Sequence, residues 1–146
     1  MEKQQLTPYG VFVILFSLLL GCSFQKSSVK EAETSRVDSL LSFYRDSLAV
    51  RPLAVISKLR TDQENISDSI NYYNLDQTIS RCYYFSNQVD SAFLLNDRVL
   101  HFVEKQPEKE DRLLKLSADA YNSRGVFFQD MNQWDSAIAV SYTHLR

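Results

Sequence analysis

The sequence predicts an all-α fold in which antiparallel helix pairs stack into a short α-solenoid. Apolar residues recur at spacings of three and four, which is the period of a helix that packs one face on a core. Only 3 Gly and 3 Pro occur in 146 residues, too few for the frequent tight turns of a β-sandwich or barrel. The sequence NQVDSAF at 87–93 recurs as NQWDSAI at 132–138, a step of 45 residues that indicates an internal repeat.

The composition limits the class of protein and the kind of partner. Hydrophobic residues make up 45% of the chain, which is typical of a globular protein rather than a disordered one. Lys and Arg number 16 against 18 Asp and Glu, a formal net charge of −2. No segment gathers the basic residues that would follow a phosphate backbone. We therefore expect no nucleic-acid partner.

The first 21 residues have the three-part layout of an export signal. A polar start with Lys3 precedes an apolar run from Tyr9 to Leu20, and small residues follow. As a helix this run would measure roughly 18 Å at about 1.5 Å per residue, short of the roughly 30 Å hydrocarbon core of a bilayer. Residues 1–21 are therefore expected to be a signal peptide rather than a membrane span.

The junction LLGC at 19–22 resembles a bacterial lipobox, although Leu20 stands where Ala or Ser is more usual. The resemblance implies cleavage before Cys22 and a lipid on its thiol. At about 0.8 kcal/mol per buried CH₂, one acyl chain binds a membrane marginally, but two or three bind it firmly. The implied location is the bacterial cell envelope, lipid-anchored and facing the periplasm or the outer membrane. Ordinary secretion and an uncleaved anchor are the alternatives.

Residues 22–35 are polar and show no apolar period, so we expect a tether between lipid and folded domain. If Cys22 is acylated, Cys82 is the one remaining thiol and cannot form an internal disulfide. Cys82 lies on an apolar helical stripe, which predicts a buried structural cysteine rather than a nucleophile.

The segment 36–66 is expected to form a first, degenerate helix pair. In its first helix the apolar residues fall at i, i+3, i+4, i+7 and i+11, one face of a helix: Val37, Leu40, Leu41, Tyr44 and Leu48. Pro52 opens the second helix, because a proline fits the first helical turn, where its missing N–H costs nothing.

A second pair is expected at 67–108. Ser67 or Asp68 can cap a helix that runs to about Ser86. Its partner runs from about Val89 to Lys105, and the segment before Pro107 ends it.

The third pair, at 109–140, is expected to be truncated in its second helix. Its first helix runs from about Lys109 to Phe128, and the second begins near Trp134. The connections between all these helices are short, so sequential helices must lie antiparallel.

The segment ADAYNSRGVFFQDMNQWDSAI at 118–138 closely resembles a tetratricopeptide repeat (TPR). The family's aromatic, small, second aromatic, helix-entry and small-contact positions hold Tyr121, Gly125, Phe128, Trp134 and Ala137. Arg124 departs from the usual Leu. The preceding unit keeps Tyr83 and Ala92 but has Ser80 where Gly is expected, and the step of 45 exceeds the family's usual step of about 34. The resemblance therefore implies a TPR-like solenoid whose earlier copies are degenerate.

The resemblance implies that these motif residues are packing positions. It places a ligand instead on the concave face, which the first helix of each pair lines. The polar candidates on those helices are Asn71, Asn74, Gln77, Arg81, Asn122 and Arg124.

No constellation in the sequence supports a reaction. His101 lies mid-helix with no Asp, Glu or Cys at metal-ligand spacing. The repeated DSL, DSI and DSA sequences suit helix starts, and their serines lack a base. We expect no catalytic residue, no cofactor and no metal.

Taken together, these features predict a non-catalytic, lipid-anchored TPR module that mediates protein–protein interaction at the cell envelope, with a protein or peptide as partner. The alternative is the periplasmic sensory input region of a TPR-containing histidine kinase or helix-turn-helix regulator. A carbohydrate-uptake lipoprotein that docks a transporter is a third hypothesis.

The end of the chain departs from the repeat. The pattern predicts an aromatic residue near 141 and a small one near 144, where the chain has Ser141 and His144. The sequence VSYTHLR resembles read-through from a sequencing-library adapter. Residues 141–146 are therefore expected to be a non-native tail on an N-terminal fragment, with a genuine short C-terminus as the alternative.

Overall fold

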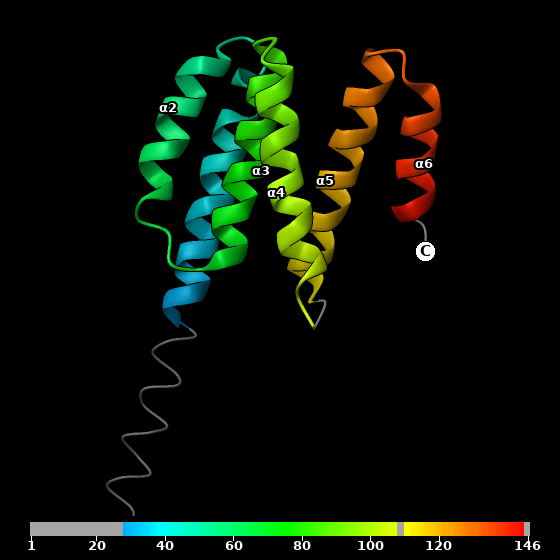
Figure 1. The fold of residues 1–146 in the computed structure, drawn as a ribbon. Helices are drawn as coiled ribbons and strands as arrows, with labels where there is room; N and C mark the ends of the chain where they lie inside the picture. Colours follow the sequence, from blue (N-terminus) through cyan, green and yellow to red (C-terminus); the bar gives the residue numbers. More distant parts are fainter. Residues whose placement is uncertain (1–27, 108–109, 145–146) are drawn as a thin grey trace, which may run out of the picture.

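The computed structural model describes residues 28–107 and 110–144 (Figure 1). Over these residues the chain is helical and contains no strand, which confirms the predicted all-α fold. The expected signal peptide, Cys22 and the first part of the expected tether lie outside the described residues. None of the helices in the described ranges has the length and apolar character needed to cross a membrane.

The helices form three antiparallel pairs that stack side by side (Figure 1). The first pair consists of a helix through residues 28–44, a 3₁₀ turn and α2. The turn within each pair lies at one end of the stack, and the connection between pairs lies at the other. The elements after residue 44 are η1 (Arg45–Ser47), α2 (Pro52–Gln63), α3 (Ser69–Phe85), α4 (Val89–Glu104), α5 (Asp111–Asp130) and α6 (Trp134–His144).

The first helix starts earlier in the chain than its apolar pattern predicts. Residues 28–35, which we expected to belong to the tether, are helical and continue into the segment that carries Val37. The carboxylate of Glu33 accepts hydrogen bonds from Ser67 and Asn71, more than thirty positions along the chain. These long-range contacts hold the polar end of the helix, and no local apolar period signals them.

The repeated NQ dipeptides form the same turn twice. Asn87 and Asn132 have φ values of 61° and 57°, the left-handed region that Asn tolerates better than most residues. The Gln88 N–H donates to the Tyr83 carbonyl at 2.9 Å, and the Gln133 N–H donates to Phe128 at the same distance. Each turn therefore ends its helix with a Schellman motif, and the 45-residue repeat is a repeat of structure as well as of sequence.

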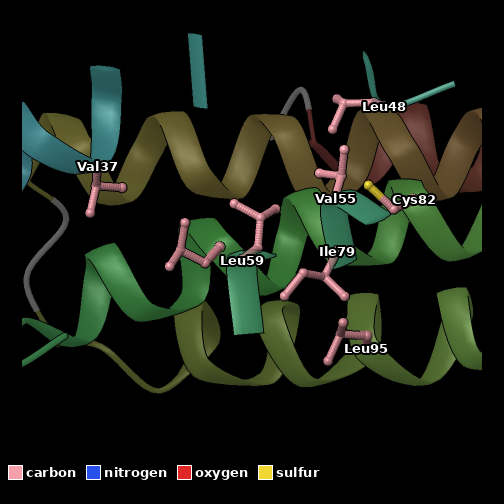
Figure 2. Close-up of a cluster of buried hydrophobic side chains, with 8 residues drawn as sticks. Val37, Leu48, Val55, Leu59, Ile79, Cys82 and Leu95 are labelled. Atoms are coloured by element: carbon pink, nitrogen blue, oxygen red, sulfur yellow. The ribbon is translucent and has the colours of Figure 1, made fainter. Parts of the chain in front are cut away.

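Two apolar clusters hold the stack together. The first joins helix 28–44, α2, α3 and, through Leu95, α4, and the second joins α3, α4 and α5. Figure 2 shows Cys82 of α3 within the first cluster, together with Val55 and Leu59 of α2. Burial raises the pKa of the Cys82 thiol to about 11, so it stays protonated at neutral pH. The prediction of a buried structural cysteine is confirmed.

Helix α5 buries a different aromatic residue from the one its sequence suggests. Phe127 is 1% exposed, whereas Phe128 is only half-buried and Val126 is 41% exposed. Phe127 stacks on Tyr84 with ring centroids 4.4 Å apart and meets Phe93 edge-on. Six residues of α5 are buried. Five of them form a stripe along the face towards α3 and α4, with Ser117 beside it: Leu113, Leu116, Ala120, Ser123 and Phe127.

Candidate functional site

A buried carboxylate ties three helices together. Asp76 of α3 is fully buried and accepts hydrogen bonds from two α2 side chains, Arg60 at 3.0 Å and Gln63 at 2.8 Å. Arg98 of α4 forms an ion pair with its second oxygen. A buried charge is tolerated only when it is paired and hydrogen-bonded, so this cluster has a packing role.

A second polar layer crosses the interface between α3, α4 and α5. The amide of Gln77 donates to the Ser123 hydroxyl at 2.8 Å and, more weakly, to the Asp119 carbonyl. The amide of Asn96 donates to Gln77 at 3.1 Å and to the Ala120 carbonyl at 3.0 Å. Gln77, which the sequence suggested as a ligand residue, is therefore mainly engaged within the protein and only 5% exposed, although it lines the groove between the first helices.

Asn71 is also buried, at the start of α3. Its amide donates to Glu33 at 3.0 Å and its carbonyl oxygen accepts from Arg112 of α5 at 2.7 Å. Asp68, one of the two predicted caps of this helix, accepts from the Asn71 N–H at 3.0 Å. The start of α3 thus joins the first helices of all three pairs.

The same hydrogen bonds control the ionisation of Glu33. Partial burial acts to raise its pKa, but hydrogen bonds from Ser67, Asn71 and the Asp68 N–H act in the opposite direction and lower it to about 2. Each of these groups donates to the ionised carboxylate, which is the form they stabilise.

Arg124 faces α4 rather than the groove between the first helices. It forms an ion pair with Asp97, and its guanidinium lies 5.9 Å from the ring centre of Phe93 and 5.5 Å from that of Phe128. Of the six polar residues predicted to bind a ligand, Asn71, Gln77 and Arg124 are therefore used for packing.

Two of the remaining candidates, Asn74 and Arg81, line a groove that we call the concave groove. It has a volume of about 140 Å³ and lies where the first helices of the three pairs meet. Each helix contributes polar side chains to it: Thr34 and Asp38 from helix 28–44, Asn74 and Arg81 from α3, and Lys115 and Asp119 from α5.

Two cations of the concave groove are available to a ligand. Arg81 and Lys115 are exposed, and no salt bridge within the described ranges involves either of them. Asn74 and Arg81 were predicted from the sequence. Lys115 and Asp119 were not, although their spacing of four on the first helix of a pair places them on one face and could have revealed them.

A larger groove lies between α5 and α6. It has a volume of about 860 Å³ and is mainly apolar, and we call it the α5/α6 groove. The predicted ligand residue Asn122 lines it, together with four of the five TPR-like motif residues: Tyr121, Gly125, Trp134 and Ala137. Phe128, the fifth, packs on Phe93 of α4.

Two motif positions differ from their predicted packing role. Trp134 is 54% exposed, although a helix-entry aromatic was expected to pack. A Cβ at Gly125 would meet only the Ser141 hydroxyl, at 3.9 Å, so this helix contact does not require glycine. Residue 141, where we expected a non-native tail to begin, lies within α6, and the Ser141 hydroxyl donates to the Ala137 carbonyl.

No metal site is evident in the described ranges. No group of three or more His, Cys, Asp or Glu side chains within them could hold a metal ion. His101 lies exposed on α4.

No family model, no curated protein and no solved structure matches the chain.

Replacing Asp76 should destabilise the protein strongly. In Asp76→Ala, Arg60, Gln63 and Arg98 lose their shared carboxylate. Because the two arginine side chains are 37% and 46% exposed and can turn to water, the expected loss is about 1 to 3 kcal/mol, mainly from the unmade hydrogen bonds. Urea denaturation followed by circular dichroism measures this free energy of unfolding. Asp38→Ala, which removes an exposed carboxylate, should change it by less than about 0.5 kcal/mol. Equal losses in the two variants would contradict the packing role of Asp76.

Glu33 should make the stability depend on pH in acid. Its pKa is about 2 in the folded chain, against an ordinary value of 4.5. The contribution is therefore complete above about pH 4.5 and is lost as the pH falls towards 2. Urea midpoints measured across this range should fall less steeply in Glu33→Gln than in the wild type. Glu31→Gln, a change at an exposed residue of the same helix, should retain the wild-type slope; if Glu33→Gln retains it too, the assignment is wrong.

Proposed function

We propose that this chain is a non-catalytic TPR-like module that binds an extended segment of a partner protein in the concave groove. The observation that carries the proposal is the convergence of polar side chains from the first helices of all three pairs on one groove. The repeated turns at Asn87 and Asn132 support the repeat architecture that produces such a face.

The side chains of the concave groove suit an extended polypeptide. An extended segment presents unpaired N–H and C=O groups along its length, and the amide of Asn74 can both donate and accept. Arg81 and Lys115 can pair with acidic side chains of that segment, and Asp38 and Asp119 can pair with basic ones. The groove is too small for a folded domain but has room for individual side chains.

We further propose that the module acts at the bacterial cell envelope, held by lipid on Cys22. The lipobox-like LLGC sequence supports this location. Two or three acyl chains on one residue provide a stable anchor, which a single chain does not.

A phage-displayed library of random linear peptides tests the concave groove. Panned on the full chain in mild detergent, the library should yield peptides with acidic residues, because Arg81 and Lys115 offer unpaired positive charge. The double variant Arg81→Glu with Lys115→Glu should bind them about tenfold or more weakly, since a charge-assisted hydrogen bond contributes about 1.5 to 3 kcal/mol. Fluorescence anisotropy of the synthesised peptides measures the change in Kd.

The matched control carries the same charge changes outside the groove. Arg51→Glu with Lys58→Glu alters two exposed residues, one directly before α2 and one within it. This double variant should leave Kd unchanged. The proposal fails if no peptide is enriched over a blank surface, or if the enriched peptides bind the groove variant as tightly as the wild type.

Metabolic labelling with radioactive palmitate tests the lipid anchor. The full chain, expressed in bacteria, should incorporate label, and Cys22→Ala should not, because the acyl chains require the amino-terminal cysteine. Cys82→Ala, which removes the buried thiol, should be labelled like the wild type. Equal labelling of the wild type and Cys22→Ala would rule out Cys22 as the attachment site.

A further inference from the structure

The α5/α6 groove exposes large apolar side chains. Ile138 is 66% exposed, and Trp134 and Val126 line the same groove. Burying apolar surface contributes roughly 25 cal/mol per Å², so exposed side chains gathered in a groove favour a covering partner.

An equivalent surface exists one repeat earlier in the chain, and there the structure shows which helix covers it. Each residue of the α5/α6 groove has a counterpart 45 positions earlier in the chain. These counterparts lie on α3 and α4, against which α5 packs. Ile138 corresponds to Phe93, which packs against Phe127 and Phe128 of α5. Ser141 corresponds to Asn96, whose amide donates to the Ala120 carbonyl. The α5/α6 groove is therefore the second copy of a surface whose first copy receives a helix.

Asn122 extends this correspondence to the polar part of the groove. It occupies the position of Gln77, whose amide donates to Ser123 of α5. An amide stands at both positions, so the α5/α6 groove also repeats the hydrogen-bonding group that meets the incoming helix.

Helix 28–44 has a stripe of side chains with the same spacing as the stripe by which α5 packs on α3 and α4. Five of the six buried α5 residues have relative positions 0, 3, 7, 10 and 14, which lie on one face of a helix. The sixth, Ser117, lies at the edge of that face, and its counterpart on helix 28–44 is Glu33, which bonds to Ser67 and Asn71. The same spacing on helix 28–44 gives a stripe of five residues, all exposed, that we call the outer stripe: Val29, Ala32, Arg36, Ser39 and Phe43.

The outer stripe and the α5/α6 groove are compatible in charge and polarity. Phe43 is 76% exposed and stands where α5 has the buried Phe127, and Ser39 stands where α5 has Ser123. At the position that corresponds to Ala120 the outer stripe has Arg36, its one charged residue, which also lies 3.8 Å from the Asp62 carboxylate within the same chain. Among the residues lining the groove the one charged side chain is Asp119, which has the opposite sign.

We propose that the chain associates head to tail with itself, the outer stripe of one copy docking into the α5/α6 groove of a second copy. The docked helix takes the place that α5 takes on α3 and α4. Because the two surfaces differ, the contact is heterologous, and each added copy leaves one stripe and one groove free for the next. The inference does not rest on the proposed function, since the concave groove uses Thr34 and Asp38, on another side of helix 28–44, although Asp119 lines both grooves.

Sedimentation velocity of the full chain in mild detergent tests this proposal. The wild type should form dimers and larger species whose share grows with concentration. Phe43→Glu disables the stripe and Ile138→Glu disables the groove, so each variant alone should sediment as a monomer. Both residues are exposed within the folded chain, and unchanged circular dichroism spectra would verify folding.

Mixing the two variants distinguishes head-to-tail docking from other kinds of association. Phe43→Glu retains its groove and Ile138→Glu retains its stripe, so an equimolar mixture should form a heterodimer and no larger species. Leu94→Glu, at a residue of α4 that is 75% exposed and belongs to neither surface, should behave like the wild type. All the proteins share the same N-terminal apolar segment, so differences between them cannot come from it. A wild type that stays monomeric at every concentration, or a mixture that remains monomeric, would overturn the proposal.

Discussion

The rest of the structure depends on the buried carboxylate of Asp76. An unpaired charge in the interior would be prohibitively unfavourable, so Arg60, Gln63 and Arg98 must all reach it, and this fixes α2 and α4 on either side of α3. Successive residues of a helix are about 100° apart, so Asn74 and Thr78, two positions before and after Asp76, point to nearly the opposite side. The constraint that buries Asp76 therefore also presents the polar residues of α3 to the concave groove.

The repeat produces two similar surfaces, of which one is covered by a helix and the other is exposed. The turns at Asn87 and Asn132 share a left-handed residue and the same hydrogen bonds, so the helices that follow them leave at similar angles. The side chains of Phe93 and Asn96 are covered by α5, whereas their counterparts Ile138 and Ser141 are exposed. Whether a side chain at one of these repeated positions is buried therefore depends on the presence of a neighbouring helix, and not on the helix to which the residue belongs.

Polar residues account for most differences between the site expected from the sequence and the one observed. Asn74 and Arg81 do line the concave groove, as helical spacing on α3 predicts. Asn71 and Gln77 lie on the same helix and look equally suited to a ligand, yet both are buried. Their partners, Arg112 and Ser123, are more than forty residues away in the chain. An amide that is satisfied by such a distant group cannot be told from an exposed one by its local sequence.

The sequence by itself determined the features that depend on neighbouring residues. These are the helical period, a cap at Ser67 or Asp68, the helix start at Pro52, the repeated polar turn and the apolar stripe that buries Cys82. Only the tertiary structure decided the early start of helix 28–44, the burial of Phe127 in place of Phe128, and the use of Asn71 and Gln77 for packing. The physical reason is that local geometry fixes which residues share a helix face, whereas burial and hydrogen-bond satisfaction depend on which other helix covers that face.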